Sequence, residues 1–242
     1  MLPELRAGNA SIRVLATHTV AELQDAAAPA RLWLAVDAPR ERTIAELVAA
    51  RDGGPREARY GRLSSRLLAA GIDGLSLGSE AVKDVTGLDL RRALIGSRPI
   101  EWAIFRLHSR AAHTTFAELT GGDARAIART LRADAAAPAA LIVTDAQTLL
   151  ISDDYPASEH DRREDFVART GAEHGATVKA IDQDRWLEVC ATLVGPRSRV
   201  SAANLDQFPY DVGRRLLFAP DLARRGPMAP AWLSDGVASV SR

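Results

Sequence analysis

The sequence predicts an α/β protein: one compact domain in which a mixed, mostly parallel sheet is flanked by helices and followed by an extended C-terminal arm. Three observations support this fold class. Short apolar runs of strand length alternate with amphipathic segments of helix length along most of the chain. Glycine and proline separate many of these segments. Hydrophobic residues make up 47% of the 242 residues, which is enough for a core of that size.

The first part of the chain is predicted to contain two strand–helix units and then a mainly helical stretch. Thr19 is the expected cap of the first helix. Residues 52–56 contain Gly53, Gly54 and Pro55, so an alternative domain boundary is expected there. The expected elements, in order, are a strand at 12–16, a helix at 20–27, a strand at 32–36, helices at 43–51 and 57–70, a loop at 71–78 and one or two short helices within 79–94.

A strand is expected at 100–107, and its apolar residues on both faces favour a central position in the sheet. Short helices at 114–119 and 123–132 follow. Residues 139–143 and 148–152 are predicted to form two strands of a hairpin. The remaining predicted elements are a helix that starts near Ser158 and ends before Gly175, a strand at 176–181 and a helix at 183–194.

Residues 196–242 contain four prolines beyond Pro196 and several aromatic residues, which is typical neither of a long helix nor of a solvated tail. We therefore expect an α/β domain at 1–195 and, at 196–242, an extended arm. The arm is expected to pack on the domain or on a neighbouring subunit. A protein partner or a homo-oligomer formed through the arm follows from this interpretation.

Composition limits the cellular setting. The formal net charge is zero, so general nucleic-acid binding is not expected. Cys190 is the only cysteine, which excludes an internal disulfide and a cysteine-cluster metal site and suits the reducing cytoplasm. The N-terminus has no apolar region typical of a signal peptide, and no apolar run approaches the roughly 18 residues of a membrane span. A cytoplasmic protein outside the membrane is expected.

Polar, titratable residues follow nearly every predicted strand. In open parallel sheets, ligands bind beyond the carboxyl ends of the strands, so these residues are candidates for a common site. Helix capping and turn formation are the alternative explanation for each of them. The residues are His18, Asp37, His108, Asp153, Asp154 and Asp182.

Asp153 and Asp154 are the strongest candidates, because adjacent carboxylates repel each other unless they are solvated or bound to a cation. They are predicted to hold Mg²⁺ or Mn²⁺ or to act as acid and base, with His18 or His108 as a catalytic partner. An acidic surface loop at the start of a helix would explain the same residues. The sequence contains no GxGxxG, GxxxxGK[ST] or HExxH motif, and the GxSxG pattern at 74–78 lacks the preceding buried strand that a nucleophile elbow needs.

Residues 148–153, the following helix as far as Gly171 and Ala172, and residues 175–178 resemble the C-terminal domain of the eukaryotic release factor 1 and Pelota class of translation factors. The resemblance covers about fifty residues of a strand–helix–strand pattern. It implies an interaction with a protein or RNA partner. The family's GGQ-type loop is missing from this sequence, so peptide release is not implied.

Two functions follow from these observations. The first is an enzyme that acts on a phosphate-bearing or nucleotide-like substrate at the carboxyl edge of the sheet, using Asp153, Asp154, His108 and His18. The second is a non-catalytic module that recognises a protein or RNA partner through the arm. The sequence leaves open which of the two applies.

Overall fold

The computed structural model describes residues 2–51, 53–79, 98–134, 137–192, 197–199, 210–211 and 216–218. Contacts cluster in two compact units, Met1–Arg110 and Ala111–Arg242. The alternative boundary at 52–56 therefore falls within the first unit. The expected boundary between 195 and 196 lies outside the described residues, as does most of the expected arm, and both stay predictions.

The first unit is built on a five-stranded sheet with the strand order β1-β2-β6-β4-β5, and a separate two-stranded ribbon joins β3 to β7. The strand predicted at 100–107 is β6, and its expected central position is confirmed. The elements are β1 (Glu4–Arg6), β2 (Ser11–Leu15), α1 (Val20–Ala27), β3 (Leu32–Trp33), α2 (Ile44–Ala50), α3 (Glu57–Tyr60), α4 (Leu63–Arg66), β4 (Leu67–Ile72), β5 (Leu75–Gly78), β6 (Trp102–Arg106) and β7 (His108–Ser109), with short 3-10 turns at Ala7–Asn9 and Ala28–Ala30.

Helices α1 and α2 begin at the same type of capping box, as the sequence predicted for Thr19. The Thr19 side chain accepts a hydrogen bond from the backbone N–H of Glu22, and the Glu22 carboxylate accepts one from the backbone N–H of Thr19. Thr43 and Glu46 repeat this arrangement in α2. Both helices therefore satisfy backbone donors that their first turns would otherwise leave unpaired.

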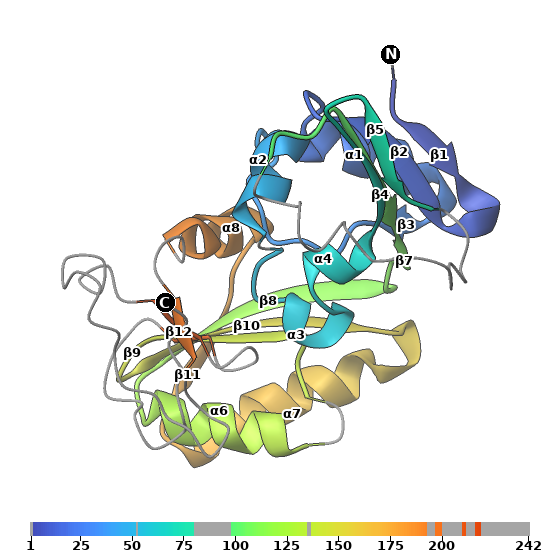
Figure 1. Ribbon diagram of the computed structural model, residues 1–242. Helices are drawn as coiled ribbons and strands as arrows, with labels where there is room; N and C mark the ends of the chain where they lie inside the picture. The colour runs from blue at the N-terminus through green and yellow to red at the C-terminus, as the bar shows by residue number, and fades with distance from the viewer. Residues whose placement is uncertain are drawn as a thin grey trace, which may run out of the picture. The chain divides into compact units, whose positions relative to one another are not determined.

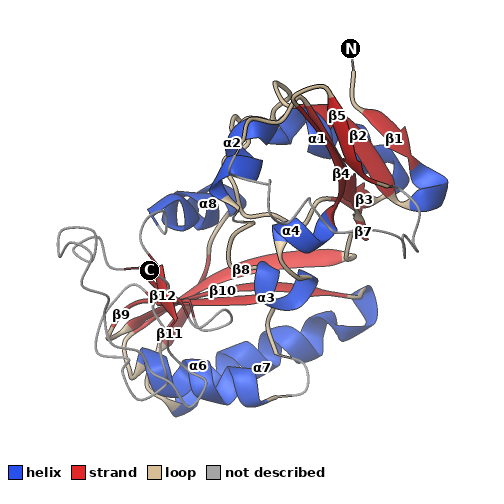
Figure 2. Cartoon of the chain, in the orientation of Figure 1, coloured by secondary structure: helices blue, strands red, loops and turns tan. Residues whose placement is uncertain are grey.

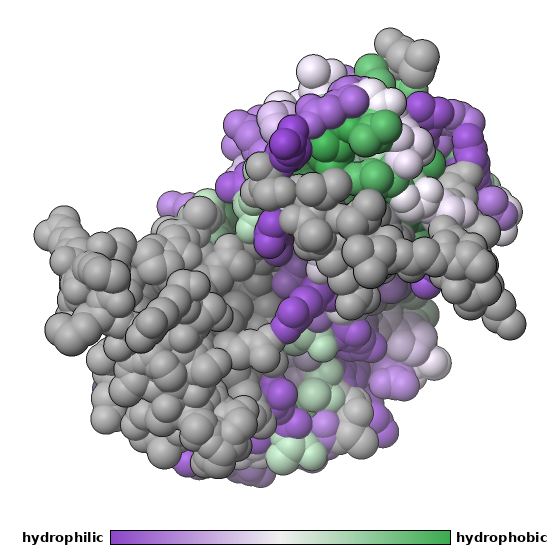
Figure 3. All heavy atoms as spheres, in the orientation of Figure 1, coloured by the Kyte–Doolittle hydropathy of each residue, from purple (hydrophilic) through white to green (hydrophobic). Residues whose placement is uncertain are grey.

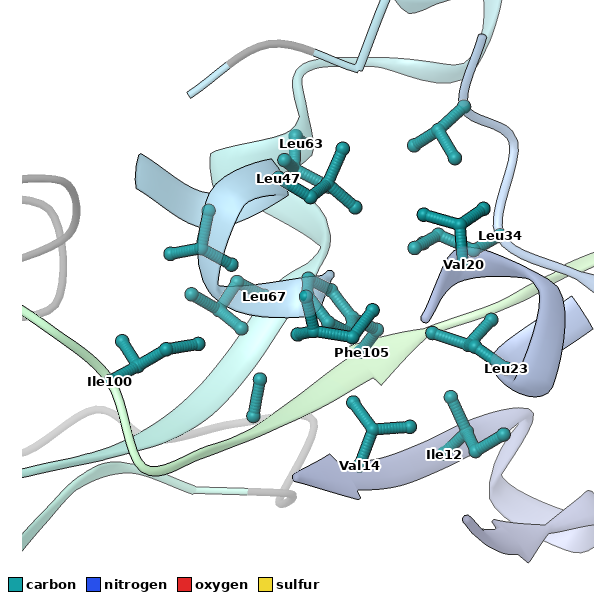
Figure 4. Packing of buried hydrophobic residues seen from close by; sticks show 14 of the residues in the cluster. Ile12, Val14, Val20, Leu23, Leu34, Leu47, Leu63, Leu67, Ile100 and Phe105 are labelled. Atoms are coloured by element: carbon teal, nitrogen blue, oxygen red, sulfur yellow. The ribbon is translucent and has the colours of Figure 1, made fainter. Parts of the chain in front are cut away.

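The main core of the first unit lies between one face of the sheet and helices α1 and α2 (Figure 2). Phe105 of β6 is fully buried at its centre, among Val14, Leu23, Leu47 and Leu67 (Figure 4). The opposite face of the sheet carries a smaller apolar cluster built from Leu68, Ala69, Trp102 and Ile104. The face of the molecule drawn in Figure 3 shows a green, hydrophobic area over the β4 and β5 part of this unit.

The second unit contains a sheet of order β11-β8-β10-β9-β13-β14-β12. Helices α6 and α7 lie side by side on one face of it, where they cover a core that includes Leu119, Ile127 and Leu149 (Figure 1). Helix α8 packs Trp186 against residues of the other face, among them Leu150. The elements are β8 (His113–Thr120), α6 (Ala124–Ala133), β9 (Ala140–Asp145), β10 (Thr148–Tyr155), a 3-10 turn at Ala157–Glu159, α7 (His160–Glu173), β11 (Thr177–Ala180), α8 (Gln183–Thr192), β12 (Arg197–Arg199), β13 (Tyr210–Asp211) and β14 (Leu216–Phe218).

The mixed α/β class is confirmed, but the prediction of a mostly parallel sheet is wrong. Every described strand pair is antiparallel. A parallel pair needs a crossover that returns the chain to the same sheet, and the first strand–helix–strand segment does not do this. Strand β2 pairs with β1 and β6, whereas β3 pairs with β7.

Three local predictions are also wrong. Residues 114–119 form strand β8 and not a helix, and residues 57–70 form two single-turn helices that run into strand β4. Residues 71–78, predicted as a loop, contain the β4–β5 turn at Asp73 and Gly74, which both have positive φ, as a type I′ hairpin requires. The helices expected within 79–94 lie outside the described residues except for Ser79. No helix in the described part of the chain is both long and apolar enough to cross a membrane.

Candidate functional site

The predicted site residues fall in both units. His18 and His108 belong to the first unit, and Asp153 and Asp154 belong to the second. His18 lies in the turn between β2 and α1, where its Nδ1 accepts a hydrogen bond from the backbone N–H of Leu15 at 3.1 Å. His108 lies in β7, where its ring contacts Tyr60. The two histidines therefore have separate surroundings.

Asp153 and Asp154 lie near the end of β10, and neighbouring side chains of a strand point to opposite faces. Asp153 follows Leu149 and Ile151 on the face that α6 and α7 cover. Asp154 follows Leu150 on the face that α8 covers, and it accepts a hydrogen bond from Thr114 Oγ1 at 2.8 Å. The two carboxylates therefore do not converge from one face of the sheet.

Asp153 forms a buried ion pair with Arg163 of α7. Both residues are at most 4% exposed, and Asp153 Oδ2 accepts hydrogen bonds from Arg163 Nε at 2.8 Å and from Arg163 Nη2. Asp153 Oδ1 accepts the backbone N–H of Asp154 at 2.9 Å. The Arg163 guanidinium therefore neutralises the Asp153 carboxylate. The sequence had predicted that a metal ion would do this.

Within the described residues, no group of three or more His, Cys, Asp and Glu side chains has the arrangement of a metal site. The assignment of Mg²⁺ or Mn²⁺ to Asp153 and Asp154 stays a prediction. Two other strand-end carboxylates have structural roles. Asp182 accepts the backbone N–H of Arg185 at 2.7 Å at the start of α8, and Asp37 binds Arg56 through both of its oxygens.

A pocket of about 490 Å³ lies beside Asp153 in the second unit. It occupies the region where β11 has ended and α7 crosses the first half of β8, because β11 pairs only with residues 117–120 of that strand. Most of its wall is apolar. The apolar lining residues include Phe116, Ile151, Val167, Val178 and Ile181.

The polar residues of the pocket come from β10, α7 and the start of β8. Asp153, Tyr155, Arg163, Glu164 and Thr115 line it. An apolar wall with a few convergent polar groups is the usual composition of a small-molecule site. The pocket is therefore a candidate small-molecule site of the second unit.

Tyr155, which lines this pocket, shares a hydrogen bond with His160. The Tyr155 hydroxyl lies 3.1 Å from His160 Nδ1, and the His113 ring stacks on both rings, with centroids 5.8 Å from Tyr155 and 4.7 Å from His160. Burial raises the pKa of Tyr155, and the charges of Glu164 and Asp153 act in the same direction. The phenol is therefore held in its protonated form, and the donor in its hydrogen bond with His160 Nδ1 depends on the tautomer of the imidazole.

Sequence reasoning assigned no site role to Tyr155, Arg163 or His113. Tyr155 was part of the segment expected to stop the strand, and Arg163 lay inside an ordinary amphipathic helix. The spacing of ten residues between Asp153 and Arg163 gives no periodic signal, because the contact depends on how α7 folds back over β10.

A second group of polar side chains surrounds His108 in the first unit. Trp33 lies opposite His108 in the β3–β7 ribbon, and Tyr60 packs between them, with ring centroids 5.5 Å from Trp33 and 5.1 Å from His108. The Arg56 guanidinium lies 5.2 Å from the centre of the Trp33 ring. Arg66, which is 2% exposed, donates from Nη1 to the backbone oxygen of Ala35 at 2.6 Å.

The stability of the folded chain is expected to depend on the protonation of His108. Burial lowers the pKa of His108 below its ordinary value of 6.5, and the positive charges of Arg66 and Arg106 lower it further. The unfolded chain then binds the proton more readily, so this contribution to the free energy of unfolding is complete above pH 6.5 and falls as the pH drops below that value. The melting temperature of the wild type should fall between about pH 7.5 and pH 5.5, in a buffer without phosphate, by more than that of His108→Gln. Equal falls in the two proteins would contradict this expectation.

Comparisons with known proteins identify the fold. No family model matches the chain, and no curated protein matches it. Among solved structures, it is similar to alkyldihydroxyacetonephosphate synthase in space group P212121, with a TM-score of 0.65 and 14% identity over 85% of this chain and 48% of that one. The same synthase in space group P1 gives a TM-score of 0.65 and 14% identity over 85% of this chain and 50% of that one. The chain thus shares its fold with about half the length of these structures.

Proposed function

We propose that this chain is part of an enzyme that acts on a phosphate-bearing substrate, and that the pocket of the second unit binds that substrate. The observation that carries the proposal is that a pocket with a mostly apolar wall is also lined by the polar side chains of Asp153, Tyr155, Arg163 and Glu164. Such a site suits an amphiphilic molecule that has a hydrocarbon part and a charged head group. The name of the structural neighbour, alkyldihydroxyacetonephosphate synthase, describes a product with both parts.

Four polar residues have a role in this proposal. Arg163, oriented by its ion pair with Asp153, presents its guanidinium to the pocket as the group that binds the phosphate. Tyr155 and His160 form the proton-transfer pair, because the phenol and the imidazole share a hydrogen bond at 3.1 Å. Asp153 acts through Arg163 and is a positioning residue.

Isothermal titration calorimetry with three compounds tests the proposal by measuring how tightly each one binds to the protein. Octyl phosphate has both an alkyl chain and a phosphate, glycerol 3-phosphate has no alkyl chain, and octanol has no phosphate. Octyl phosphate is expected to bind most tightly. Val167→Trp, which fills the pocket from α7, should weaken its binding by about tenfold or more.

Arg169→Trp is the matched control, because Arg169 is an exposed residue of the same helix outside the pocket. It should bind octyl phosphate like the wild type. Tyr155→Phe keeps the ring and should also retain binding, while it removes the transferable proton. The proposal fails if octyl phosphate does not bind, or if Val167→Trp binds it as the wild type does.

A further inference from the structure

Arg66 is a buried cation in the first unit, far into the protein interior at 2% exposure. Its Nη1 binds the backbone oxygen of Ala35, but its Nε and Nη2 are buried and have no hydrogen-bond partner among the described residues. In the same described part of the chain, Trp33 Nε1 and His108 Nε2 are also buried without a partner. Buried polar atoms of folded proteins are nearly always hydrogen-bonded, so this group of side chains requires an explanation. We call Trp33, Arg66 and His108 the donor cluster.

The nearest carboxylates do not compensate Arg66, because they bind other groups. Asp37 accepts the backbone N–H and Nη1 of Arg56, at 2.8 and 3.1 Å. Glu57 Oε1 accepts the backbone N–H groups of Gly53 and Leu63, at 2.8 and 2.7 Å. Their charges favour the guanidinium, while the hydrogen bonds given above join both carboxylates to other groups. A buried charge without a hydrogen-bonded counter-charge is unfavourable, so an external anion would stabilise it.

The two unpartnered nitrogens of Arg66 have the geometry of an oxyanion site. Nε–H and Nη2–H lie on the same edge of a planar guanidinium and point in the same direction, which matches two oxygens of a phosphate or a carboxylate. Trp33 and His108 belong to the same region, since they oppose each other in the β3–β7 ribbon and His108 experiences the charge of Arg66. The indole N–H is a third donor there.

The backbone at Gly53 packs closely against this edge of Arg66. A Cβ on Gly53 would lie 2.9 Å from Arg66 Nη2 and 3.0 Å from Glu57 Oε1. Gly53 does not have a positive φ, so alanine is compatible with the backbone conformation there. Its methyl group would lie closer to Nη2 than side-chain atoms normally pack, so the Arg66 or Glu57 side chain would have to shift. This glycine is therefore a position at which access to Nη2 can be blocked while the charge of Arg66 is kept.

From these contacts we infer that the donor cluster binds a small oxyanion, a phosphate or carboxylate group, through the Nε and Nη2 edge of Arg66. This site lies in the first unit and does not depend on the pocket of the second unit or on the function proposed for it. Its ligand is either a free anion or the anionic group of a larger molecule. The shared chemistry is two or more oxygens that carry a negative charge.

Thermal unfolding of the full chain at constant ionic strength tests the inference, with sodium chloride replaced stepwise by phosphate, by acetate or by adenosine diphosphate. The wild type is expected to melt at a higher temperature as the oxyanion concentration rises. A stronger effect of adenosine diphosphate than of phosphate would identify a group on a larger molecule, and the reverse would identify the free anion. No effect of any of the three anions overturns the inference and leaves water as the partner of these donors.

Substitutions in and next to the donor cluster test whether the anions bind there. Arg66→Met should abolish the response to the anions while remaining at least as stable as the wild type in chloride, because it removes an uncompensated charge. Gly53→Ala should weaken binding by about tenfold, and Trp33→Phe, which removes one donor and keeps the packing, by about threefold to tenfold. These two variants decide the question if Arg66→Met does not fold. Arg40→Met removes an exposed arginine of the same unit and should respond like the wild type, and an unchanged response of both Gly53→Ala and Trp33→Phe would contradict the site.

Discussion

Asp153→Asn is expected to lower the free energy of unfolding of the protein by about 3–5 kcal/mol. The substitution keeps the size of the side chain but removes its charge, and it leaves the Arg163 guanidinium buried at 4% exposure without a counter-ion. Breaking one side of a buried ion pair is costly because the remaining charge cannot be solvated. Urea denaturation followed by circular dichroism measures the loss.

Asp165→Asn provides the control for this experiment. Asp165 lies in the same unit on an exposed position of α7, so its substitution should change the free energy of unfolding by no more than about 0.5 kcal/mol. The double change Asp153→Leu and Arg163→Met should recover much of the loss, because two apolar side chains then replace the two charges. If Asp153→Asn is as stable as the wild type, the ion pair does not anchor α7, and the catalytic or metal-binding role predicted from the sequence gains support.

The contrast between Asp153 and Asp154 explains why the sequence predicted the chemistry of this site incompletely. Two adjacent carboxylates suggested a cation, and a cation is indeed present beside Asp153, as the guanidinium of Arg163. The sequence analysis ended this strand at residue 152, whereas β10 continues to Tyr155. Asp153 and Asp154 are therefore adjacent residues of a strand and point to opposite faces of the sheet. The position of Arg163 follows from the packing of α7, which local sequence does not determine.

The sequence predicted correctly those elements whose structure is determined by residues that are close together in the chain. The capping box of Thr19 and Glu22 marks the start of α1, and the apolar runs at 139–143 and 148–152 form the predicted β9–β10 hairpin. The Asp73-Gly74 pair is an equally local signal for a hairpin that the sequence interpretation missed. Recognising it would have assigned β4 and β5 correctly.

Strand direction could not be predicted in the same way. The alternation of strands and helices suggested crossovers between parallel strands, but the segments on either side of α1 joined different sheets. The run of Thr114, Thr115 and Phe116 has a high β-propensity, yet residues 114–119 were predicted to form a short helix. Pairing with β10 determines its structure, and that pairing joins residues about forty positions apart.

The polar cluster of the first unit was predictable only in part. His108 was a candidate because it follows the longest predicted strand, and the structure does surround it with aromatic rings. Trp33 and Arg66 were not candidates, because a tryptophan in a strand and an arginine in an expected helix are ordinary. Their unusual property is the absence of hydrogen-bond partners for buried nitrogens, which only a structure can reveal.

Phe105→Ala is expected to lower the free energy of unfolding by about 3–5 kcal/mol. Phe105 is fully buried in the central strand β6, and its ring contacts the core that α1, α2 and β4 share (Figure 4). Alanine removes the ring and leaves a cavity, because neighbouring side chains on three different elements cannot all move inward to fill it. Urea denaturation followed by circular dichroism gives the change.

Leu75→Ala is the matched control for Phe105→Ala. Leu75 is also an apolar residue of the first unit's sheet, but it lies on β5 and is 64% exposed, so its loss should cost no more than about 0.5 kcal/mol. A loss below about 1 kcal/mol for Phe105→Ala would mean that the first unit is not packed around β6. In that case β6 would still be the central strand of the sheet, as the sequence predicted. The hydrophobic core that stabilises the first unit would then have to lie elsewhere.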